Sequence, residues 1–285
     1  MLTGRVIDGA GASDQFLRDL RRTVADMIAE NYVGGLRDIA HENGLRLWCE
    51  NYGHWGFPGE FLIYGGYTDE IGGEFWTTNR ELGTIECRAA SSSGHIYGKR
   101  RIYAEAFTSA LKPEHHPGFI KARGEELFCE GINHFVLHVY AHQPRDGMPG
   151  TNPWFGTAFH RNTAWFMQSR DWMKYLQRCH TLLQQGDPVA DVAVYIGDFA
   201  PQMTGPADPV PEGYDYDYMG SDAILRNLQV VDGEWVVYDE HAPKRIAARW
   251  KLLALPHLAH ARQRVLARID ELKRAGGRVV DTVPV

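Results

Sequence analysis

The feature that most constrains the fold is a unit that repeats along the first half of the chain. In each unit a short apolar run is followed by a stretch with apolar residues at helical spacing. The runs are GLRLWCEN (44–51), EIGGEFW (70–76), RIYAEAFTS (101–109) and NHFVLHVYAHQ (133–143). Their centres lie about 26 to 33 residues apart. A strand–helix unit of roughly 30 residues is typical of parallel α/β folds, so the sequence predicts a parallel sheet with helices packed on it.

The rest of the chain divides into helices and a second, smaller α/β region. Apolar spacing predicts helices over 16–42 and 163–185, and a restart of strands at 191–198. Only four or five strand–helix units fit before residue 190, whereas a complete (β/α)8 barrel needs about 250 residues. We therefore expect a partial (β/α)8-type (TIM) barrel over 1–187, or a piece of a longer barrel protein, followed by a small α/β domain over 188–285. The Pro- and Tyr-rich segment 200–218 is expected to be a loop.

Charge and motifs exclude several classes of function. The chain has 30 Lys and Arg against 36 Asp and Glu, a formal charge of -6, which argues against a nucleic-acid binder. No apolar run approaches the roughly 20 residues of a membrane span. The glycine-rich nucleotide-binding motifs and the G-x-S-x-G elbow of serine hydrolases do not occur. The first residues lack the pattern of a secretory signal, which leaves the compartment open.

Acidic residues lie near the ends of three of the predicted strands. In a parallel α/β fold the carboxyl ends of the strands meet at one edge, where active sites gather. Glu105 is the first catalytic candidate, with Glu50 and Glu74 beside it. Two of them have a structural alternative: Glu105 as the partner of an arginine such as Arg88 or Arg101, and Glu50 as a helix cap or loop hydrogen bonder. Glu74 has a second functional role open to it, as a calcium ligand, because calcium prefers hard oxygen ligands.

Polar and aromatic residues near these acids are candidates for sugar contacts. Asn51 follows Glu50 directly, and residues 144–160 form a Gly/Pro-rich loop of the kind that is usually functional. Packing within loops is the alternative in each case. Three in-phase histidines on one strand chelate a metal poorly, so hydrogen bonding to hydroxyl groups is favoured for His138 and His142 over zinc. The candidates are Asn51, His54, Trp55, Glu60, Trp76, His138, His142, Trp154 and His160.

The segments CENYGHWGFPGEFLIYGGYTDEIGGEFW, IECRAASSSGHIYGKRRIYAEAFTS and CEGINHFVLHVYAHQP resemble the α-L-rhamnosidases of glycoside hydrolase family 106. The resemblance covers roughly residues 16–285. It implies a (β/α)8 catalytic barrel, inverting cleavage of terminal α-L-rhamnose by two carboxylates, and a calcium ion at the site, for which Glu74 is the candidate ligand. Family members are much longer than this chain, and some act outside the cytoplasm, in the periplasm or secreted. The second region is similar to flavodoxin-like or amidotransferase-like domains.

Two readings of the chain follow. In the first it is a glycosidase that acts on a carbohydrate and needs neither nucleic acid nor membrane. In the second it is a catalytically inactive, truncated piece of a barrel that only binds carbohydrate. Part of a barrel leaves strand edges unpaired, so self-association through these edges is also expected.

Overall fold

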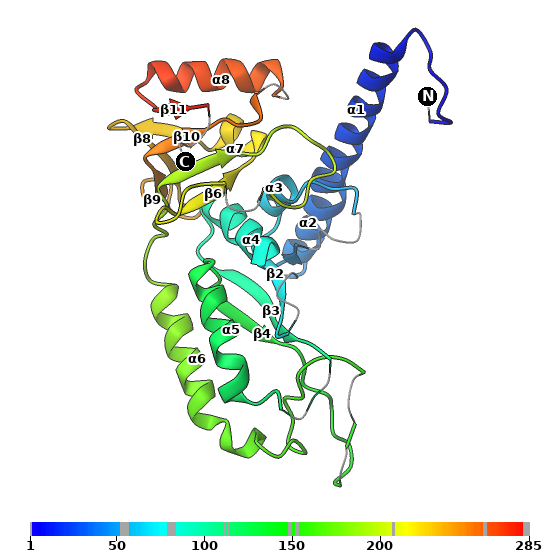
Figure 1. Cartoon of the computed structure of the whole chain (residues 1–285), viewed down its shortest axis with the longest axis vertical. Helices are drawn as coiled ribbons and strands as arrows, with labels where there is room; N and C mark the ends of the chain where they lie inside the picture. Colours follow the sequence, from blue (N-terminus) through cyan, green and yellow to red (C-terminus); the bar gives the residue numbers. More distant parts are fainter. Residues whose placement is uncertain are drawn as a thin grey trace.

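The structure is a computed structural model that describes residues 2–51, 57–78, 84–110, 112, 114–147, 150–151, 154–206, 209–258 and 261–281. Within these residues the chain forms two four-stranded parallel sheets and one three-stranded antiparallel sheet (Figure 1). The prediction of an α/β fold with parallel sheets is confirmed. The described strands close no barrel, and the partial (β/α)8 barrel stays a prediction.

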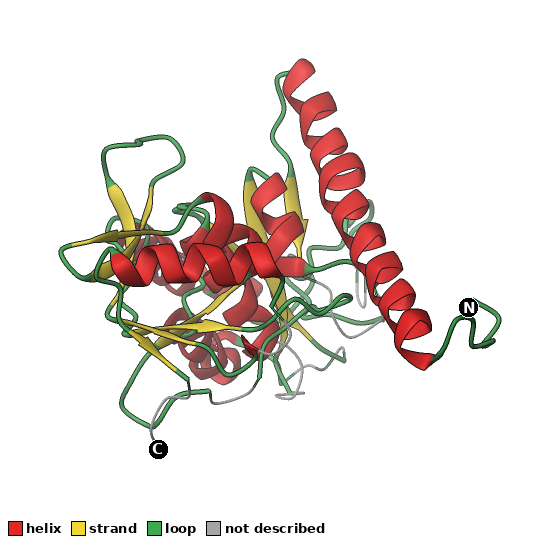
Figure 2. Cartoon of the chain, turned by 90° about the horizontal axis from the view of Figure 1, so that it is seen from above, coloured by secondary structure: helices red, strands yellow, loops and turns green. Residues whose placement is uncertain are grey.

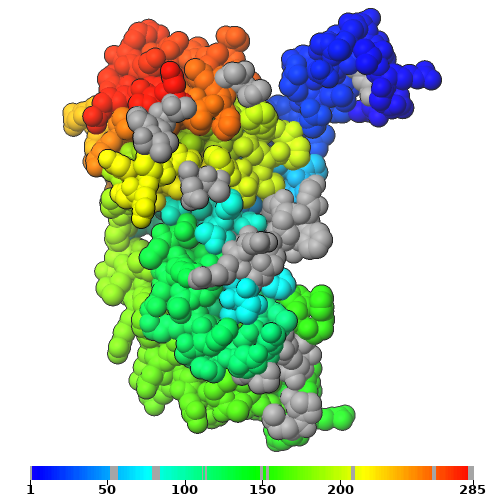
Figure 3. Space-filling model, viewed as in Figure 1, coloured from blue at the N-terminus to red at the C-terminus, as the bar shows by residue number. Residues whose placement is uncertain are grey.

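The chain begins with a long helical segment that stands beside the sheets. Helix α1 (Ala10–Met27) continues through the π-helical stretch η1 (Ile28–Gly34) into α2 (Gly35–Glu42), as the spacing over 16–42 predicts. Figure 2 shows this segment along one side of the molecule, and the space-filling view shows α1 projecting from the body (Figure 3). No helix in the described ranges is both long and apolar enough to span a bilayer.

The first sheet carries the repeated units found in the sequence. Its strands, in spatial order, are β1 (Trp48–Glu50), β2 (Glu70–Trp76), β3 (Ile102–Thr108) and β4 (His134–Leu137). The connections hold α3 (Phe61–Tyr64), η2 (Gly65–Tyr67), α4 (Thr84–Ile96) and α5 (Pro117–Cys129). After β4 come η3 (Phe166–Gln168) and α6 (Arg170–Leu183). The predicted helix over 163–185 is therefore confirmed, although its first turn is a separate 3-10 turn.

The second region contains the other parallel sheet and the antiparallel one. The parallel sheet has the order β11 (Val279–Val280), β10 (Leu252–Ala254), β5 (Val192–Tyr195) and β6 (Tyr216–Met219), with α7 (Ser221–Arg226) and α8 (Gln263–Arg274) between strands. The antiparallel sheet consists of β7 (Gln229–Val231), β8 (Glu234–Tyr238) and β9 (Ile246–Trp250).

The expected loop over 200–218 is wrong at its end, because Tyr216–Met219 is the strand β6. A charged residue in the middle of YDYDY suggests solvent, but Asp217 is only 1% exposed. Its carboxylate accepts hydrogen bonds from His95 Nδ1 at 2.8 Å and Trp250 Nε1 at 2.9 Å. Burial opposes ionisation, but the neighbouring His95 and these hydrogen bonds outweigh it and lower the pKa of Asp217. The paired acid can therefore lie inside a sheet.

Helix α4 is buried between the two parallel sheets. Its central residues Ser91, Ser92 and Ser93 are each 0% exposed, and the Ser92 hydroxyl accepts a hydrogen bond from the Tyr218 backbone at 2.9 Å. On its other side the helix packs against β2, and one continuous apolar core includes residues of both regions. The domain boundary near residue 187 therefore stays a prediction.

Gly73 of β2 lets α4 approach the first sheet closely. A Cβ at this position would lie 3.2 Å from both Cys87 Cα and the Glu86 carbonyl oxygen. Both are backbone atoms of a buried helix, so they cannot rotate away. We expect Gly73→Ala to lower the free energy of unfolding by about 1–3 kcal/mol, measured by urea denaturation.

Gly35→Ala is the matched control. A Cβ at Gly35 meets nothing within 4 Å, and alanine favours helix over glycine, so this variant should be as stable as the parent or more so. Equal destabilisation by both changes would contradict the close-packing interpretation of Gly73.

Candidate active site

Three carboxylates share one face of the first sheet, which we call the carboxylate face. Glu50 lies opposite Gly72 in the register, and Glu74 lies opposite Glu105. Residues two apart on a strand point to the same side, so Gly72 and Glu74 belong to the same face. Paired residues of neighbouring strands also share a face, so Glu50 and Glu105 point to that side as well. The opposite face of the sheet packs against α4.

The three acids lie at or beyond the middle of their strands. Glu50 is the last residue of β1, Glu74 is the third residue from the end of β2, and Glu105 is the central residue of β3. This is the edge at which parallel α/β proteins place their ligands. The sequence prediction that these acids meet at one edge is therefore reproduced by the strand register.

Burial and mutual repulsion raise the pKa of two of the acids. Burial first, then the charges of Glu105 and Glu74, raise the pKa of Glu50 to about 8. Burial and the Glu105 charge also raise the pKa of Glu74 to about 7, against an opposing effect of the Trp76 indole. Carboxylic acids with a raised pKa can donate a proton near neutral pH, which is the requirement for a general acid.

A β-bulge shapes the end of β3 beside Glu105. Phe75 pairs with Ala106 but Trp76 pairs with Thr108, so Phe107 is an extra residue, and its φ is +67°. A positive φ is rare for a bulky side chain, and such strain is concentrated at functional sites.

The bulge decides which way Thr108 points. In a regular strand Glu105 and Thr108, three residues apart, would face opposite sides. The extra residue returns Thr108 to the carboxylate face, where its hydroxyl donates a 2.7 Å hydrogen bond to Glu105 Oε1. That donor suits the ionised form of Glu105.

Aromatic rings flank the acids. His138 Nδ1 lies 3.7 Å from Glu105 Oε1, and the His138 ring lies 5.0 Å from that of Phe155. Trp76 is nearly parallel to Phe155 with ring centroids 6.5 Å apart, and Trp154 contacts Phe155 at 4.2 Å. Trp154 is 87% exposed. Rings beside carboxylates offer apolar surfaces for the faces of a sugar.

Two other residues that were predicted to contact the sugar, Asn51 and Glu60, are buried and interact with other parts of the fold. Asn51 is 1% exposed, and its amide nitrogen donates to the backbone oxygens of Glu86 at 3.1 Å and Met203 at 3.3 Å. Glu60 is also 1% exposed and forms an ion pair with Arg22 of α1. Burial first raises the pKa of Glu60, to about 7, although Arg22 opposes it. The groups that influence Glu60 are Arg22, Asp198 and Arg262, not the three acids of the carboxylate face.

The remaining candidates are scattered. His142 is exposed in the segment after β4, and His160 is buried, which lowers its pKa. His54 and Trp55 lie outside the described residues, so their predicted roles stay predictions.

Thr108 is the residue of the site that the sequence reasoning missed, because the alternation of side chains along a regular strand places it on the face opposite Glu105. Phe155 was predicted as one cluster with Trp154 and His160 in the loop 144–160, and the structure places its ring beside those of Trp76 and Trp154.

The described residues do not complete a calcium site. Calcium takes six to eight oxygen ligands. Within the described part of the chain, no three His, Cys, Asp or Glu side chains converge as metal ligands, around Glu74 or elsewhere. No step of the chemistry below is therefore derived through calcium.

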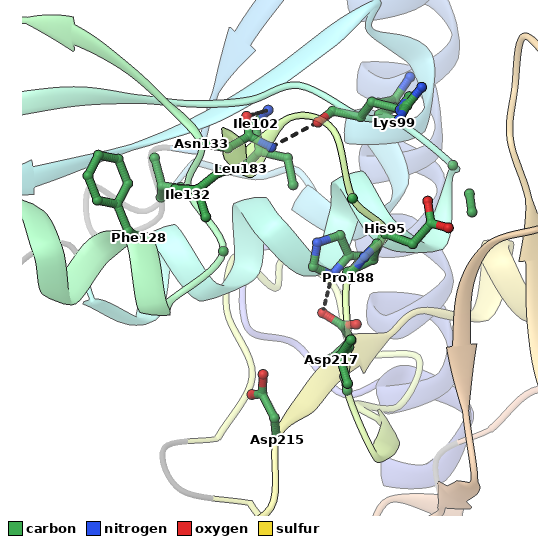
Figure 4. A pocket seen from close by; sticks show the side chains of 18 of the residues that line it. His95, Lys99, Ile102, Phe128, Ile132, Asn133, Leu183, Pro188, Asp215 and Asp217 are labelled. Atoms are coloured by element: carbon green, nitrogen blue, oxygen red, sulfur yellow. Dashed lines mark hydrogen bonds and ion pairs between the residues drawn. The ribbon is translucent and has the colours of Figure 1, made fainter. Parts of the chain in front are cut away.

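A cavity of about 330 Å³ lies at the other end of the first sheet (Figure 4). Ile102 and Asn133 line it at the amino-terminal ends of β3 and β4, and the paired His95 and Asp217 line it from α4 and β6. In parallel α/β folds this end serves stability rather than catalysis. The carboxylate face is therefore the candidate active site.

Comparison with known proteins agrees with this geometry. A family model described as alpha-L-rhamnosidase, that of glycoside hydrolase family 106, matches residues 1–285. The chain belongs to glycoside hydrolase family 106. The resemblance found in the sequence is thereby confirmed.

Individual relatives of this family 106 chain are longer than it is. The chain is 32% identical to a Formosa agariphila protein named "Putative beta-glucuronidase", over 99% of this chain and 24% of that one. It resembles the structure of a rhamnosidase from Novosphingobium sp. PP1Y, with a TM-score of 0.83, 30% identity, and coverage of 96% of this chain and 26% of the other. The chain thus spans about a quarter of the length of these relatives.

A beta-galactosidase from Marinomonas ef1 shares the fold alone. The TM-score is 0.51 at 14% identity, with 92% of this chain and 43% of the other covered. The parallel α/β architecture of this family 106 chain is thus also found in a distant glycosidase.

The raised pKa of Glu50 predicts a pH-dependent stability. Because the pKa rises from 4.5 to about 8 on folding, the folded state holds this proton more tightly. The resulting stabilisation is complete below about pH 4 and is lost as the pH rises to about 8. Glu50→Gln cannot ionise, so its free energy of unfolding relative to the parent should increase between pH 5 and pH 9. Urea denaturation at several pH values measures this difference.

Glu212→Gln is the control, because Glu212 is exposed. Its difference from the parent should not change with pH. Parallel stability curves for Glu50→Gln and the parent would show that Glu50 is ionised throughout this range.

Proposed function

We propose that this chain carries carboxylate machinery of a glycoside hydrolase that removes terminal α-L-rhamnose from glycans or glycosides. The observation that carries the proposal is the carboxylate face, where three acids of neighbouring parallel strands lie together and the charge of Glu105 helps to raise the pKa of both Glu50 and Glu74. Membership of family 106 supplies the substrate class.

The chemistry divides between a protonated and an ionised acid. Glycoside hydrolysis needs one carboxylic acid to protonate the leaving oxygen, and in an inverting enzyme a second carboxylate activates water. We assign the acid to Glu50, whose pKa is about 8, and the base to Glu105, which accepts the Thr108 hydrogen bond. Glu74 lies between them in the sheet, and its charge together with that of Glu105 helps to keep Glu50 protonated.

Backbone spacing determines how far the side chains of the acid and the base must approach each other in an inverting arrangement. Adjacent strands lie about 4.8 Å apart and residues two apart on a strand about 6.6 Å, so Glu50 and Glu74 are about 8 Å apart at the backbone. Glu50 and Glu105 are about 12 Å apart by the same geometry, and their side chains must approach each other. Inverting enzymes hold their carboxyl groups about 6.5–9.5 Å apart, leaving room for the water.

Hydrolysis of an aryl α-L-rhamnoside by the 285-residue chain tests the proposal. We expect turnover that Glu105→Gln lowers by several orders of magnitude, while the exposed control Glu212→Gln retains it. Glu50→Gln should lose more activity on substrates with poor leaving groups than on activated ones, because only the former need protonation. Assays with added calcium and with a chelator test the family's implied metal at Glu74.

Carbohydrate binding without hydrolysis is the second candidate, favoured by the exposed ring of Trp154 beside Phe155 at the carboxylate face. A folded chain that binds rhamnosides without turnover would support this candidate and contradict the enzyme proposal. Self-association through β1 and β4, the edges of the first sheet, also stays a prediction. A strict monomer by light scattering would contradict it.

Thr108 is proposed as a positioning residue for Glu105. Thr108→Val keeps the side-chain volume but removes the 2.7 Å hydrogen bond, whose worth to a charged acceptor is about 1.5–3 kcal/mol. We expect kcat to fall about 10- to 100-fold, with KM little changed, and the pH–rate profile to shift.

Thr108→Ser is the matched variant, because it restores the hydroxyl and should restore most of the activity. Equal activity losses for the valine and serine variants, with unchanged pH profiles, would show that Thr108 acts only through packing.

A further inference from the structure

The second parallel sheet has a topological switch point between β5 and β10. From β5 the chain passes to β6 on one side, and after the antiparallel sheet it returns to β10 on the other side of β5. All strand pairs in this sheet are parallel. In open α/β sheets, ligands bind in the crevice beyond the carboxyl ends of the strands where the order reverses.

A cavity of about 540 Å³, which we call the switch-point cavity, lies at this position. The segments after β5 and after β10 supply one wall, and α1 supplies the other, beside this region in Figure 1. The residues used below are Asp198 and Phe199 after β5, Arg262 before α8, and Arg18, Arg21 and Arg22 of α1. The volume lies within the range of small-molecule sites.

The lining is rich in arginine although the chain as a whole is acidic. Four guanidinium groups line the cavity, against the carboxylates of Asp19 and Asp198, in a chain of formal charge -6. Guanidinium groups bind carboxylate, phosphate and sulfate through paired hydrogen bonds. Any of these guanidinium groups that has no acidic partner in the fold can therefore bind an oxyanion.

Two of the arginines are fixed within the wall. Arg262 donates to Asp198 Oδ1 from Nε at 3.0 Å, and its backbone N–H donates to Asp198 Oδ2 at 2.8 Å. The Asp198 side chain is only 4% exposed. Arg22 pairs with Asp26 at 2.7 Å and with Glu60. These contacts anchor the cavity wall to the rest of the fold, and they leave Arg22 and Arg262 few hydrogen-bond donors for a ligand.

The other two arginines are available. Arg21 makes no hydrogen bond or ion pair with any described residue, and Arg18 Nη2 donates only to Gln15 Oε1, at 2.9 Å. Both lie on α1, one turn or less apart. They line a cavity whose opposite wall is fixed by the Arg262–Asp198 ion pair. Ligand binding therefore costs little conformational entropy on that wall.

We propose that the switch-point cavity binds a sugar-sized organic oxyanion, a phosphate, sulfate or carboxylate ester or acid, through Arg18 and Arg21. The volume exceeds what a bare ion needs, and Phe199, 40% exposed, gives the wall an apolar surface for the body of the ligand. The site lies on the second sheet, so the proposal does not depend on hydrolysis at the carboxylate face.

Calorimetric titration of the 285-residue chain tests the proposal. The probes are glucose 6-phosphate, glucose 6-sulfate and glucuronate, which distinguish the three oxyanions, with neutral glucose and inorganic phosphate beside them. We expect at least one of the charged sugars to bind more tightly than glucose and inorganic phosphate. Binding should weaken as the salt concentration rises.

The variant Arg18→Gln/Arg21→Gln should lose at least about tenfold in affinity for that sugar. Arg178→Gln, a change at an exposed arginine of α6, should bind as the parent does. Neither Arg18 nor Arg21 pairs with an acid of the fold, so circular dichroism should show the double variant folded. No binding of any charged sugar at millimolar concentration, or undiminished binding by the double variant, would overturn the proposal. If inorganic phosphate bound as tightly as the charged sugars, the proposal that the ligand is an organic oxyanion would be wrong.

Discussion

The burial of helix α4 between two parallel sheets is the constraint on which the rest of the structure depends. Where a helix is covered on both sides there is room only for small side chains, and the central run AASSSG of α4 meets this requirement. Gly73 lets its backbone approach β2, and Ser92 accepts a hydrogen bond from β6. Because α4 is fixed to both sheets, β2 and β3 are fixed as well, and their other face is the one that carries the carboxylates. The serines of this helix are thus packing residues.

The carboxylate face contains two unfavourable features, the burial of acidic side chains and the repulsion between them. Glu50 and Glu74 lie partly or fully buried beside a third acid, which raises the pKa of Glu50 to about 8 and that of Glu74 to about 7. Burying like charges costs stability, and proteins keep such arrangements mainly where a proton must be delivered. The left-handed backbone of Phe107 is a second local cost at the same place. Together the two costs fit a site shaped for chemistry, whose rings and carboxylates lie along one edge of the sheet.

Sequence patterns predicted the parallel α/β class, the four apolar runs of the first sheet and the three acids at their ends. They succeeded because strand–helix periodicity and the alternation of side chains are local properties. The patterns failed where a contact distant in sequence decides the outcome. Asp217 lies in a strand because its carboxylate forms hydrogen bonds with the side chains of His95 and Trp250. Asn51 and Glu60 follow the first strand, yet contacts with Met203 and Arg22 take both into the fold.

The sequence by itself determined the family, the order of strands and helices, and the acids that share a strand edge, because each depends on the identity and spacing of nearby residues. Only the tertiary structure decided that Thr108 faces Glu105, since a one-residue bulge reverses the alternation that spacing alone would give. Only the tertiary structure placed the arginines of α1 opposite the switch point of a sheet more than 170 residues later in the chain. Side-chain direction and long-range proximity depend on how the elements pack, and local sequence does not encode that packing.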